Sequence, residues 1–158
     1  MSKFVLIDGH SILNRAFYGV PIFTNSEGLH TNAVFGFLNI MFKIIDSKQP
    51  DYMAVAFDVH QPTFRHEMFK DYKGTRKPMM EELREQVPVI KELLQKMNIT
   101  TVELPGYEAD DVIGTLSKKG EKAGMEVDVI SGDRDLLQLA SDHITICIPK
   151  TKKGQTTV

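Results

Sequence analysis

Acidic residues gather at the ends of short apolar runs in this sequence. The runs VLID, VAFD and VISGD each finish at or beside an aspartate, and PGYEADDVIG places three acids within four positions. The acids that could act together are Asp8, Asp58, Glu108, Asp110, Asp111, Asp133 and Asp135. Two carboxylates about 4 Å apart repel each other by about 1 kcal/mol in water and about 4 kcal/mol at an effective dielectric of about 20. Such a group requires protons or bound cations.

The residue types indicate which cation these acids would bind. Carboxylate oxygens without a cysteine cluster suit a hard divalent ion, Mg²⁺ or Mn²⁺. The histidines at 10, 30, 60, 66 and 143 are scattered without HxxxH spacing, so zinc is not expected. Several acids with room for two ions suit two-metal hydrolysis of a phosphodiester.

Each acid also has an ordinary structural interpretation. An aspartate after a strand commonly caps a helix or forms a turn, and Glu108, Asp110 and Asp111 could complement a helix N-terminus at about 0.3–1 kcal/mol per charge. Other phosphoryl chemistry is less well supported. No GxxxxGK[ST] loop is present, and a phosphatase that uses an aspartyl-phosphate would need DxD at the first strand, where the sequence reads DGH. A phosphatase of small metabolites is therefore only a third hypothesis.

Alternating strand and helix patterns position these acids. Apolar runs predict strands at 3–8, 52–58, 100–104, 126–131 and 144–148. Helical periodicity marks Asn32 to Ser47, Met79 to Met97 with a break at Pro88, and a segment that starts near Ala109. The alternation predicts an α/β fold with a central, mostly parallel sheet flanked by helices. Ligands bind outside the carboxyl ends of such strands, so the acids should share one edge.

Three further segments complete the expected organisation. Residues 18–31 contain scattered Gly, Pro, Asn and Ser and read as a loop. DLLQLA, which starts at Asp135, reads as a helix whose N-terminus Asp133 and Asp135 could stabilise. The last ten residues read as a turn followed by the start of another strand.

A basic and aromatic segment follows the VAFD run. Residues 65–77, RHEMFKDYKGTRK, contain five basic residues against two acidic ones, and Phe64, Phe69 and Tyr72 are interleaved with them. Cations that hold phosphates, with rings that stack on unpaired bases, suit a nucleic-acid substrate. The alternative is a solvated charge run with its aromatic rings in the core. The position directly after a strand that ends in an acid favours the functional interpretation.

Composition sets the broad class. The chain has 158 residues, of which 42% are hydrophobic, and a net charge of −2, which suits one globular domain and gives no global signal for nucleic acid or membrane. No stretch approaches the roughly 20 apolar residues of a membrane span. The single cysteine, Cys147, fits a reducing compartment, so we expect a cytoplasmic protein without a membrane partner.

The motifs together resemble a known family. The blocks VLIDGH, VAFD, FRHEMFKDYKGTRKPMMEELREQ, PGYEADDVIG and SGDRDLLQL cover essentially the whole chain. They resemble the N-terminal part of the 5′-nuclease domain of bacterial DNA polymerase I, and thereby the wider flap-endonuclease family. The resemblance implies a PIN-like (resolvase-like, Rossmann-like) fold. It also implies a 5′-3′ exonuclease and flap endonuclease that uses two divalent ions, Mg²⁺ or Mn²⁺, on nicked or branched DNA during replication and repair.

The resemblance also implies roles for individual residues. The first metal site would comprise Asp8, Asp58, Glu108 and Asp110. The second would include Asp133 and Asp135, and Asp111 would act through water. Catalysis would depend on Asp58 together with Lys73 and Arg76, the basic pair that steers the scissile phosphate. DNA would contact Arg65, Lys70, Tyr72, Lys73 and Arg76.

One departure qualifies the expected activity. The family's GDxSDN-type motif and its helix-turn-helix-like DNA clamp lie downstream of the last match, and this sequence stops at Val158 before either. We therefore expect residues 1–158 to be a single domain from a longer polypeptide, to which a DNA polymerase could be linked. Two hypotheses stay open: a 5′-nuclease, impaired or not by the missing part, and a catalytically silent nucleic-acid-binding domain.

Overall fold

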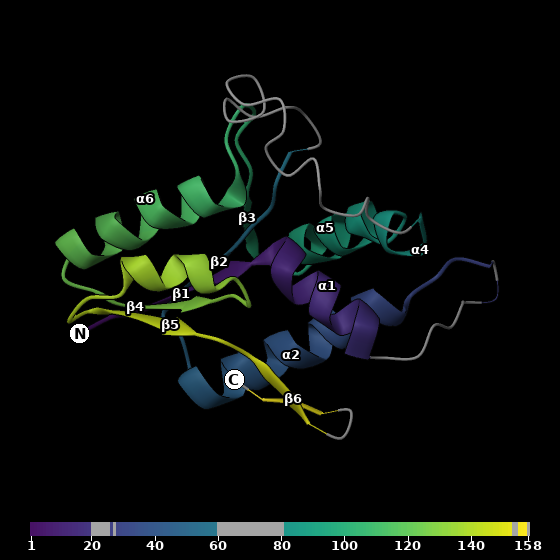
Figure 1. The fold of residues 1–158 in the computed structure, drawn as a ribbon, viewed down its shortest axis with the longest axis horizontal. Helices are drawn as coiled ribbons and strands as arrows, with labels where there is room; N and C mark the ends of the chain where they lie inside the picture. Colours follow the sequence, from purple (N-terminus) through teal and green to yellow (C-terminus); the bar gives the residue numbers. More distant parts are fainter. Residues whose placement is uncertain (20–25, 27, 60–80, 153–154, 158) are drawn as a thin grey trace.

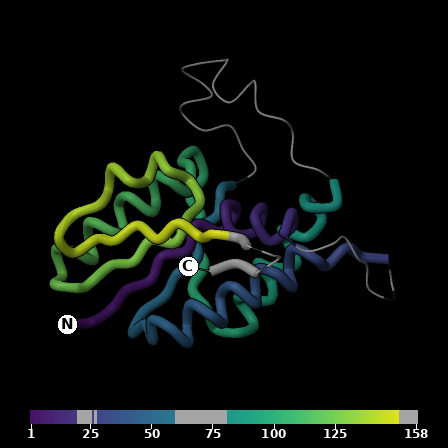
Figure 2. Tube along the Cα trace, turned by 60° about the horizontal axis from the view of Figure 1, so that its bottom comes forward, coloured from purple at the N-terminus to yellow at the C-terminus, as the bar shows by residue number. Residues whose placement is uncertain are grey.

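Five parallel strands form the centre of the molecule. The computed structural model describes residues 1–19, 26, 28–59, 81–152 and 155–157, with backbone alone from residue 151 onward. The strand order is β3-β2-β1-β4-β5, and every neighbouring pair is parallel. Figure 2 shows the purple β1 strand between the blue β2 strand and the green β4 strand. The bounds are β1 (Lys3–Asp8), β2 (Tyr52–Ala56), β3 (Thr100–Val102), β4 (Glu126–Ile130) and β5 (Ile144–Cys147). The predicted α/β fold is confirmed.

Helices cover both faces of this sheet (Figure 1). They are α1 (Gly9–Gly19), α2 (Asn32–Lys48), α4 (Glu81–Arg84), α5 (Val87–Lys96), α6 (Ala109–Lys122) and the 3₁₀ helix η1 (Arg134–Leu139). Two short antiparallel strands, β6 (Lys150–Lys152) and β7 (Gln155–Thr157), follow the sheet. Among the described helices, none combines the length and the hydropathy that a membrane crossing needs.

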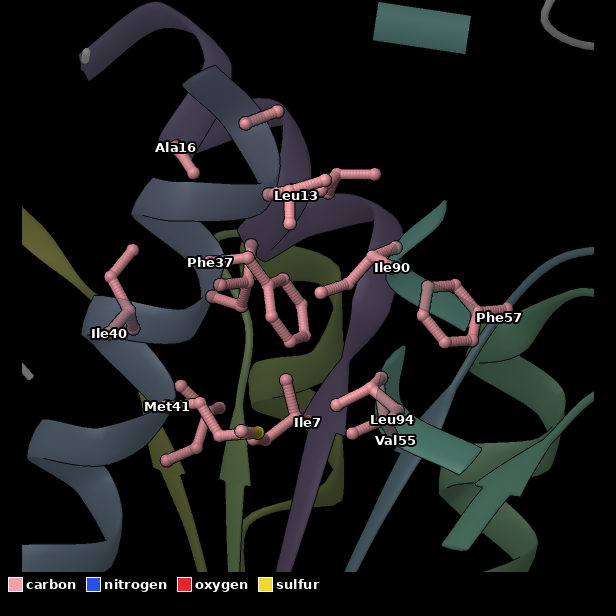
Figure 3. Packing of buried hydrophobic residues seen from close by; sticks show 14 of the residues in the cluster. Ile7, Leu13, Ala16, Phe37, Ile40, Met41, Val55, Phe57, Ile90 and Leu94 are labelled. Atoms are coloured by element: carbon pink, nitrogen blue, oxygen red, sulfur yellow. The ribbon is translucent and has the colours of Figure 1, made fainter. Parts of the chain in front are cut away.

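Alternate residues of each strand fill two separate cores. Ile7 and Val55 point to one face, where they pack with Leu13 of α1, Phe37 of α2 and Leu94 of α5 (Figure 3). All five are essentially fully buried. A side chain such as Phe37 contributes about 1.5–3 kcal/mol when it is removed from water. This face holds α1 and α2 firmly against the strands that carry the acids.

The opposite face of the sheet packs against α6 and η1. Leu6 and Val129 contact the side of α6 that bears Ile113, and Leu136 of η1 joins the same cluster. Successive side chains of a strand point to opposite faces, so Leu6 and Ile7 belong to different cores. With both faces covered, the carboxyl ends of the strands form an edge that is open to solvent and ligands.

A buried glutamine joins three of the helices. Gln86 is fully buried, and its Oε1 accepts hydrogen bonds from the backbone NH groups of Ala33 at 2.7 Å and Val34 at 3.1 Å. Its Nε2 donates to Oδ1 of Asn32 at 2.9 Å, and Nδ2 of Asn32 donates to the carbonyl oxygen of Phe17 at 3.0 Å. The first turn of a helix lacks intrahelical acceptors for its NH groups, so Gln86 caps α2 from the segment between α4 and α5.

The helical segment before β3 is interrupted as predicted, but slightly earlier. Helix α4 ends at Arg84, and α5 begins at Val87 with Pro88 in its first turn. A proline is tolerated there because its missing NH would have no intrahelical acceptor. The break therefore lies at residues 85–86, which frees the Gln86 side chain to reach α2.

Two expectations about elements need correction. The pattern analysis assigned no helix directly after the first strand, yet α1 occupies Gly9–Gly19 and includes Tyr18, which was assigned to a loop. The segment after Asp133 is a short 3₁₀ helix. At the end of the chain, the antiparallel pairing of β6 with β7 agrees with the expected turn followed by another strand.

Candidate functional site

The buried Asp8 carboxylate lies at the carboxyl end of the central strand. It is 5% exposed, Oδ2 accepts from the hydroxyl of Ser131 at 2.7 Å, and Oδ1 accepts from the backbone NH of Ser11 at 3.4 Å. Burial raises the pKa of Asp8 above its ordinary value of 3.8, and the charge of Asp58 adds to the increase. The two hydrogen bonds and the nearby His10 oppose that shift. Asp8 and Asp58 therefore share one electrostatic environment.

Asp58 links the end of β2 to the start of α6. Its Oδ1 accepts a hydrogen bond from the backbone NH of Ala109 at 2.6 Å. His10 lies beside the same residue, with Nε2 3.3 Å from the Asp58 carbonyl oxygen and its ring edge-on to Phe57, centroids 5.5 Å apart. The partial positive charge of the α6 N-terminus stabilises the Asp58 carboxylate.

The PGYEADD segment turns before its helix begins. Gly106 has φ +85°, a left-handed conformation that suits glycine, and the NH of Tyr107 donates to the Leu104 carbonyl at 3.1 Å. Glu108 is then extended, with φ −83° and ψ 160°, and α6 starts at the next residue. Glu108 is only 3% exposed. The turn at Gly106 therefore precedes a buried Glu108.

Glu108 and Asp111 also form a reciprocal helix cap. The Glu108 carboxylate accepts from the backbone NH of Asp111, and Oδ2 of Asp111 accepts from the backbone NH of Glu108 at 3.0 Å. The buried Oε1 atom of Glu108 makes no hydrogen bond within the described part of the chain, although the residue has partners. The capping interpretation of this acidic cluster is thus correct for Asp111 in this structure.

The SGDRD loop after β4 carries the last two predicted acids. Asp133 caps η1, because its Oδ1 accepts from the backbone NH of Asp135 at 2.9 Å. The NH of Asp133 donates to Oγ of Ser131 at 3.0 Å, and the same hydroxyl donates to Asp8. Asp133 is half-buried, and Asp135 is exposed. One serine therefore connects this loop to Asp8.

A groove adjoins the acids on the α6 side. It has a volume of about 1180 Å³ and lies between the β3–α6 segment and η1. Four predicted acids line it: Glu108, Asp110, Asp111 and Asp135. Asp8, Asp58 and Asp133 are not among its lining residues. The structure thus divides the predicted acids between a group that follows β1, β2 and β4 and a group along this groove.

The glycine after Asp8 is required by close packing at the site. A Cβ at Gly9 would lie 2.5 Å from a ring carbon of Phe57 and 2.8 Å from the carbonyl oxygen of Ala56. Gly9→Ala should therefore force the end of β2 away and lower the free energy of unfolding by about 1–3 kcal/mol, measured by chemical denaturation.

Gly114→Ala provides the matched control for that substitution. A Cβ there would meet only Leu139 atoms, at 3.6 Å or more, and alanine is the better helix former in α6. Equal stability losses in the two variants would show that crowding at Gly9 is not the cause.

Asp128 shows how a buried acid outside the site is balanced. Its Oδ2 lies 3.0 Å from Nζ of Lys48 and 3.8 Å from Nζ of Lys3. Asp8 is instead held by a hydroxyl and a backbone NH and lies near another acid. The contrast separates an acid with two lysine partners from one that accepts hydrogen bonds from a hydroxyl and a backbone NH.

The donor chemistry of the site fits a hard divalent ion. All predicted ligands offer carboxylate oxygens, and a cation would favour the charged form of Asp8, which burial and Asp58 disfavour. The acids are nevertheless too far apart in this structure for three of them to share an ion. Among the described residues, no three His, Cys, Asp or Glu side chains are close enough to hold a metal ion. In this structure Asp58, Asp111 and Asp133 accept backbone NH groups instead.

The predicted DNA contacts fall outside the part of the chain that the structure describes. These are Arg65, Lys70, Tyr72, Lys73 and Arg76, all within residues 60–80. The described residues before and after this range are Val59 and Glu81.

The sequence analysis missed three residues beside the acids. Ser11 and Ser131 bond to Asp8, and His10 contacts Asp58. The signals were present, because His10 and Ser11 follow Asp8 within three residues, and Ser131 stands two positions before Asp133. Hydroxyl groups next to acids are common in turns, so their types alone did not mark them.

Comparison with known proteins identifies the family. The profile of "5′-3′ exonuclease, N-terminal resolvase-like domain" matches residues 3–158. DNA polymerase I of Bacillus caldotenax is 53% identical over 156 residues, which are 99% of this chain but 18% of that protein. A 5′-3′ exonuclease of Aquifex aeolicus is 41% identical over 149 residues, with 94% of this chain and 52% of that protein covered. The chain thus spans less than a fifth of the polymerase relatives.

Solved structures show the same fold. A T5 5′-exonuclease described with bound divalent zinc ions aligns with a TM-score of 0.70 at 24% identity, over 91% of this chain and 54% of that one. A T5 D15 flap endonuclease, described in complex with DNA and metal ions, aligns with a TM-score of 0.69 at 23% identity, with the same coverage. The resemblance drawn from the sequence motifs is confirmed. The chain belongs to the 5′-3′ exonuclease family, in which it matches the N-terminal resolvase-like domain.

Proposed function

We propose that this chain is the metal-binding catalytic part of a 5′-nuclease that hydrolyses phosphodiesters in nicked or branched DNA during replication and repair. The observation that carries the proposal is the buried Asp8 carboxylate beside Asp58, at the carboxyl edge of the parallel sheet. A carboxylate that is disfavoured by both burial and a like charge suits a site that receives a cation.

The proposal assigns roles to the acids around this edge. Asp8, Asp58, Glu108 and Asp110 would hold one divalent ion, and Asp133 with Asp135 would contribute to a second, with Asp111 acting through water. When bound, Mg²⁺ or Mn²⁺ ions would activate the attacking water and stabilise charge on the leaving oxygen. The solved T5 relatives, which are described with divalent ions, support this assignment.

Substrate binding is assigned to the basic segment outside the described residues. Lys73 and Arg76 would bind the scissile phosphate, with Arg65, Lys70 and Tyr72 along the strand. The T5 D15 flap endonuclease described in complex with DNA supports a DNA substrate. The relatives that continue as DNA polymerase I support a linked polymerase as partner, and residues 1–158 would then be one domain of that protein.

Cleavage of a 5′-labelled flap tests the proposed activity. The wild-type chain should cut the flap in Mg²⁺ or Mn²⁺ and stop when the ion is chelated. Asp58→Ala should lower the rate about 10²-fold, because it removes a charge close to Asp8 and the bond to the start of α6. Asp46→Ala, on the exposed face of α2, is the matched control.

A second function is favoured by the open spacing of the acids. Because no three potential ligands among the described residues are close enough for a metal ion, the chain could bind DNA without cutting it. Flap binding by the wild type, without cleavage in either ion, would establish this silent DNA-binding domain and overturn the nuclease proposal for this chain.

A further inference from the structure

Two serine hydroxyls connect the first strand's turn to the SGDRD loop. Ser131 is fully buried; its hydroxyl donates to Asp8 at 2.7 Å and accepts from the NH of Asp133 at 3.0 Å. In the reverse direction, the Oγ of Ser11 accepts from the NH of Gly132 at 2.7 Å. The turn after β1 and the SGDRD loop after β4 therefore each contribute one serine to the contact between them, which we call the junction.

These bonds begin where the backbone ladder stops. The parallel pairing of β1 with β4 ends at Ile7 and Ile130. One residue further along each strand, the contact between Asp8 and Ser131 is made through side chains. Beyond the ladder no other backbone pairing fixes the loop against β1 among the described residues. The two serines thus fix the loop's position relative to Asp8.

The SGDRD loop carries Asp133 and Asp135, and Asp8 lies across the junction from it. A shift of the loop would change the separation between Asp8 and both Asp133 and Asp135. Gly132, the neighbour of Ser131, is also closely packed, because a Cβ there would lie 3.2 Å from Oγ of Ser11. The serine hydrogen bonds and this close packing hold the loop beside Asp8.

We propose that Ser131, supported by Ser11, is a positioning residue that sets the spacing between Asp8 and the acids of the SGDRD loop for divalent-ion binding. The inference rests on the proposed metal site and deepens it. It requires no contact between the serines and an ion. Partners that orient metal ligands typically change metal affinity by about 10–100-fold when removed.

Direct measurement of ion binding tests the proposal without relying on cleavage. Mn²⁺ titrations of the full chain, followed by electron paramagnetic resonance, should show binding about 10-fold weaker in Ser131→Ala than in the wild type. Ser131→Thr keeps the hydroxyl and should restore binding to within about twofold of the wild type. Ser11→Ala should weaken binding in the same direction, and the double alanine variant should lose less than the product of the single losses, because the serines act as one unit.

Ser117→Ala is the matched control. Ser117 is also fully buried, and its hydroxyl donates to the Gly114 carbonyl at 3.0 Å within α6, away from the junction. This variant loses a comparable hydrogen bond but should bind Mn²⁺ like the wild type. A general loss of stability would affect both alanine variants alike.

The outcomes separate this inference from the proposed nuclease activity. Unchanged Mn²⁺ binding in Ser131→Ala, equal weakening in Ser117→Ala, failure of Ser131→Thr to restore binding, or no Mn²⁺ binding by the wild type would each overturn it. Flap cleavage is measured in parallel. A wild type that binds Mn²⁺ through Ser131 but does not cleave would leave the inference intact and overturn the nuclease proposal.

Discussion

Asp8→Asn is expected to raise the melting temperature of the metal-free chain by about 2–4 °C, the shift that about 1 kcal/mol produces in a domain of this size. The same substitution should lower metal-dependent cleavage about 10³-fold, as loss of a strong electrostatic group does in other active sites. The asparagine removes a buried charge that burial and Asp58 disfavour. Its amide can still accept from the NH of Ser11 and donate to Ser131.

The stability gain should depend on pH in a defined direction. The pKa of Asp8 in the folded chain lies above its ordinary value of 3.8. At a pH between 3.8 and the folded-state pKa, the folded state therefore binds more protons than the unfolded state. The Asp8 contribution therefore makes the wild type less stable as the pH rises through that window. The difference in melting temperature between Asp8→Asn and wild type should be largest at neutral pH and shrink towards acid.

Asp46→Asn, an exposed acid on α2, is the control for the change of charge. Thermal melts of both variants and the wild type, in chelator and across pH, give the comparison. Two results would contradict the interpretation that burial and Asp58 destabilise the charged form of Asp8. One is a lower melting temperature for Asp8→Asn than for the wild type at neutral pH. The other is a difference in melting temperature between them that does not vary with pH.

The second large effect concerns Gln86. Gln86→Leu should lower the free energy of unfolding by about 3 kcal/mol, because it leaves several buried polar groups without partners at about 1–3 kcal/mol each. These are the NH groups of Ala33 and Val34, and the carbonyl of Glu82, to which Nε2 donates at 2.8 Å. The midpoint of denaturant unfolding measures the loss.

Two further substitutions make the Gln86 result interpretable. Gln95→Leu changes an exposed position of α5 and should alter stability by less than about 0.5 kcal/mol. Gln86→Glu keeps the acceptor for α2 but loses both donations and places a buried carboxylate against the oxygens of Asn32 and Glu82, so its stability should fall below that of the wild type. Wild-type stability in Gln86→Leu would show that water satisfies these groups equally well.

Much of the fold followed from local patterns in the sequence. The runs at Lys3–Asp8, Tyr52–Ala56 and Glu126–Ile130 are apolar on both faces, as strands between two helical layers must be. Asp8 ends the first of these runs and Asp58 follows the second by two residues, so the sequence predicts that both lie on one edge of the sheet. Burial on both faces is a strong and local signal.

The errors have equally local causes. Helix α1 begins at a glycine directly after β1, and its one start signal, Asp8 at the N-cap position, was also interpreted as a possible turn residue or metal ligand. Its apolar positions Ile12, Leu13, Ala16 and Phe17 do have helical spacing, which would have found it. Gln86, in turn, is a polar residue whose hydrogen bonds reach α2, more than 50 residues away in sequence, so no local pattern could reveal its burial.

The arrangement of the acids was predictable only in part. Strand ends indicated a shared edge, but not that Asp111 and Asp133 would turn towards backbone NH groups. That choice depends on how α6 and η1 begin, and a hydrogen bond of about 1 kcal/mol decides it. The contact of Ser131 with Asp8 joins the ends of two strands and required the topology.

The pairing of β1 with β4 also has a consequence in time. Asp8 and Ser131 are separated by 123 residues along the chain. A ribosome that adds 5–20 residues per second needs about 6–25 s to make Ser131 after it has made Asp8. During that interval the first strand can associate with α1, α2 and β2, but its other edge has no partner. The junction between Asp8 and the loop that follows β4 therefore cannot form until long after Asp8 has been synthesised.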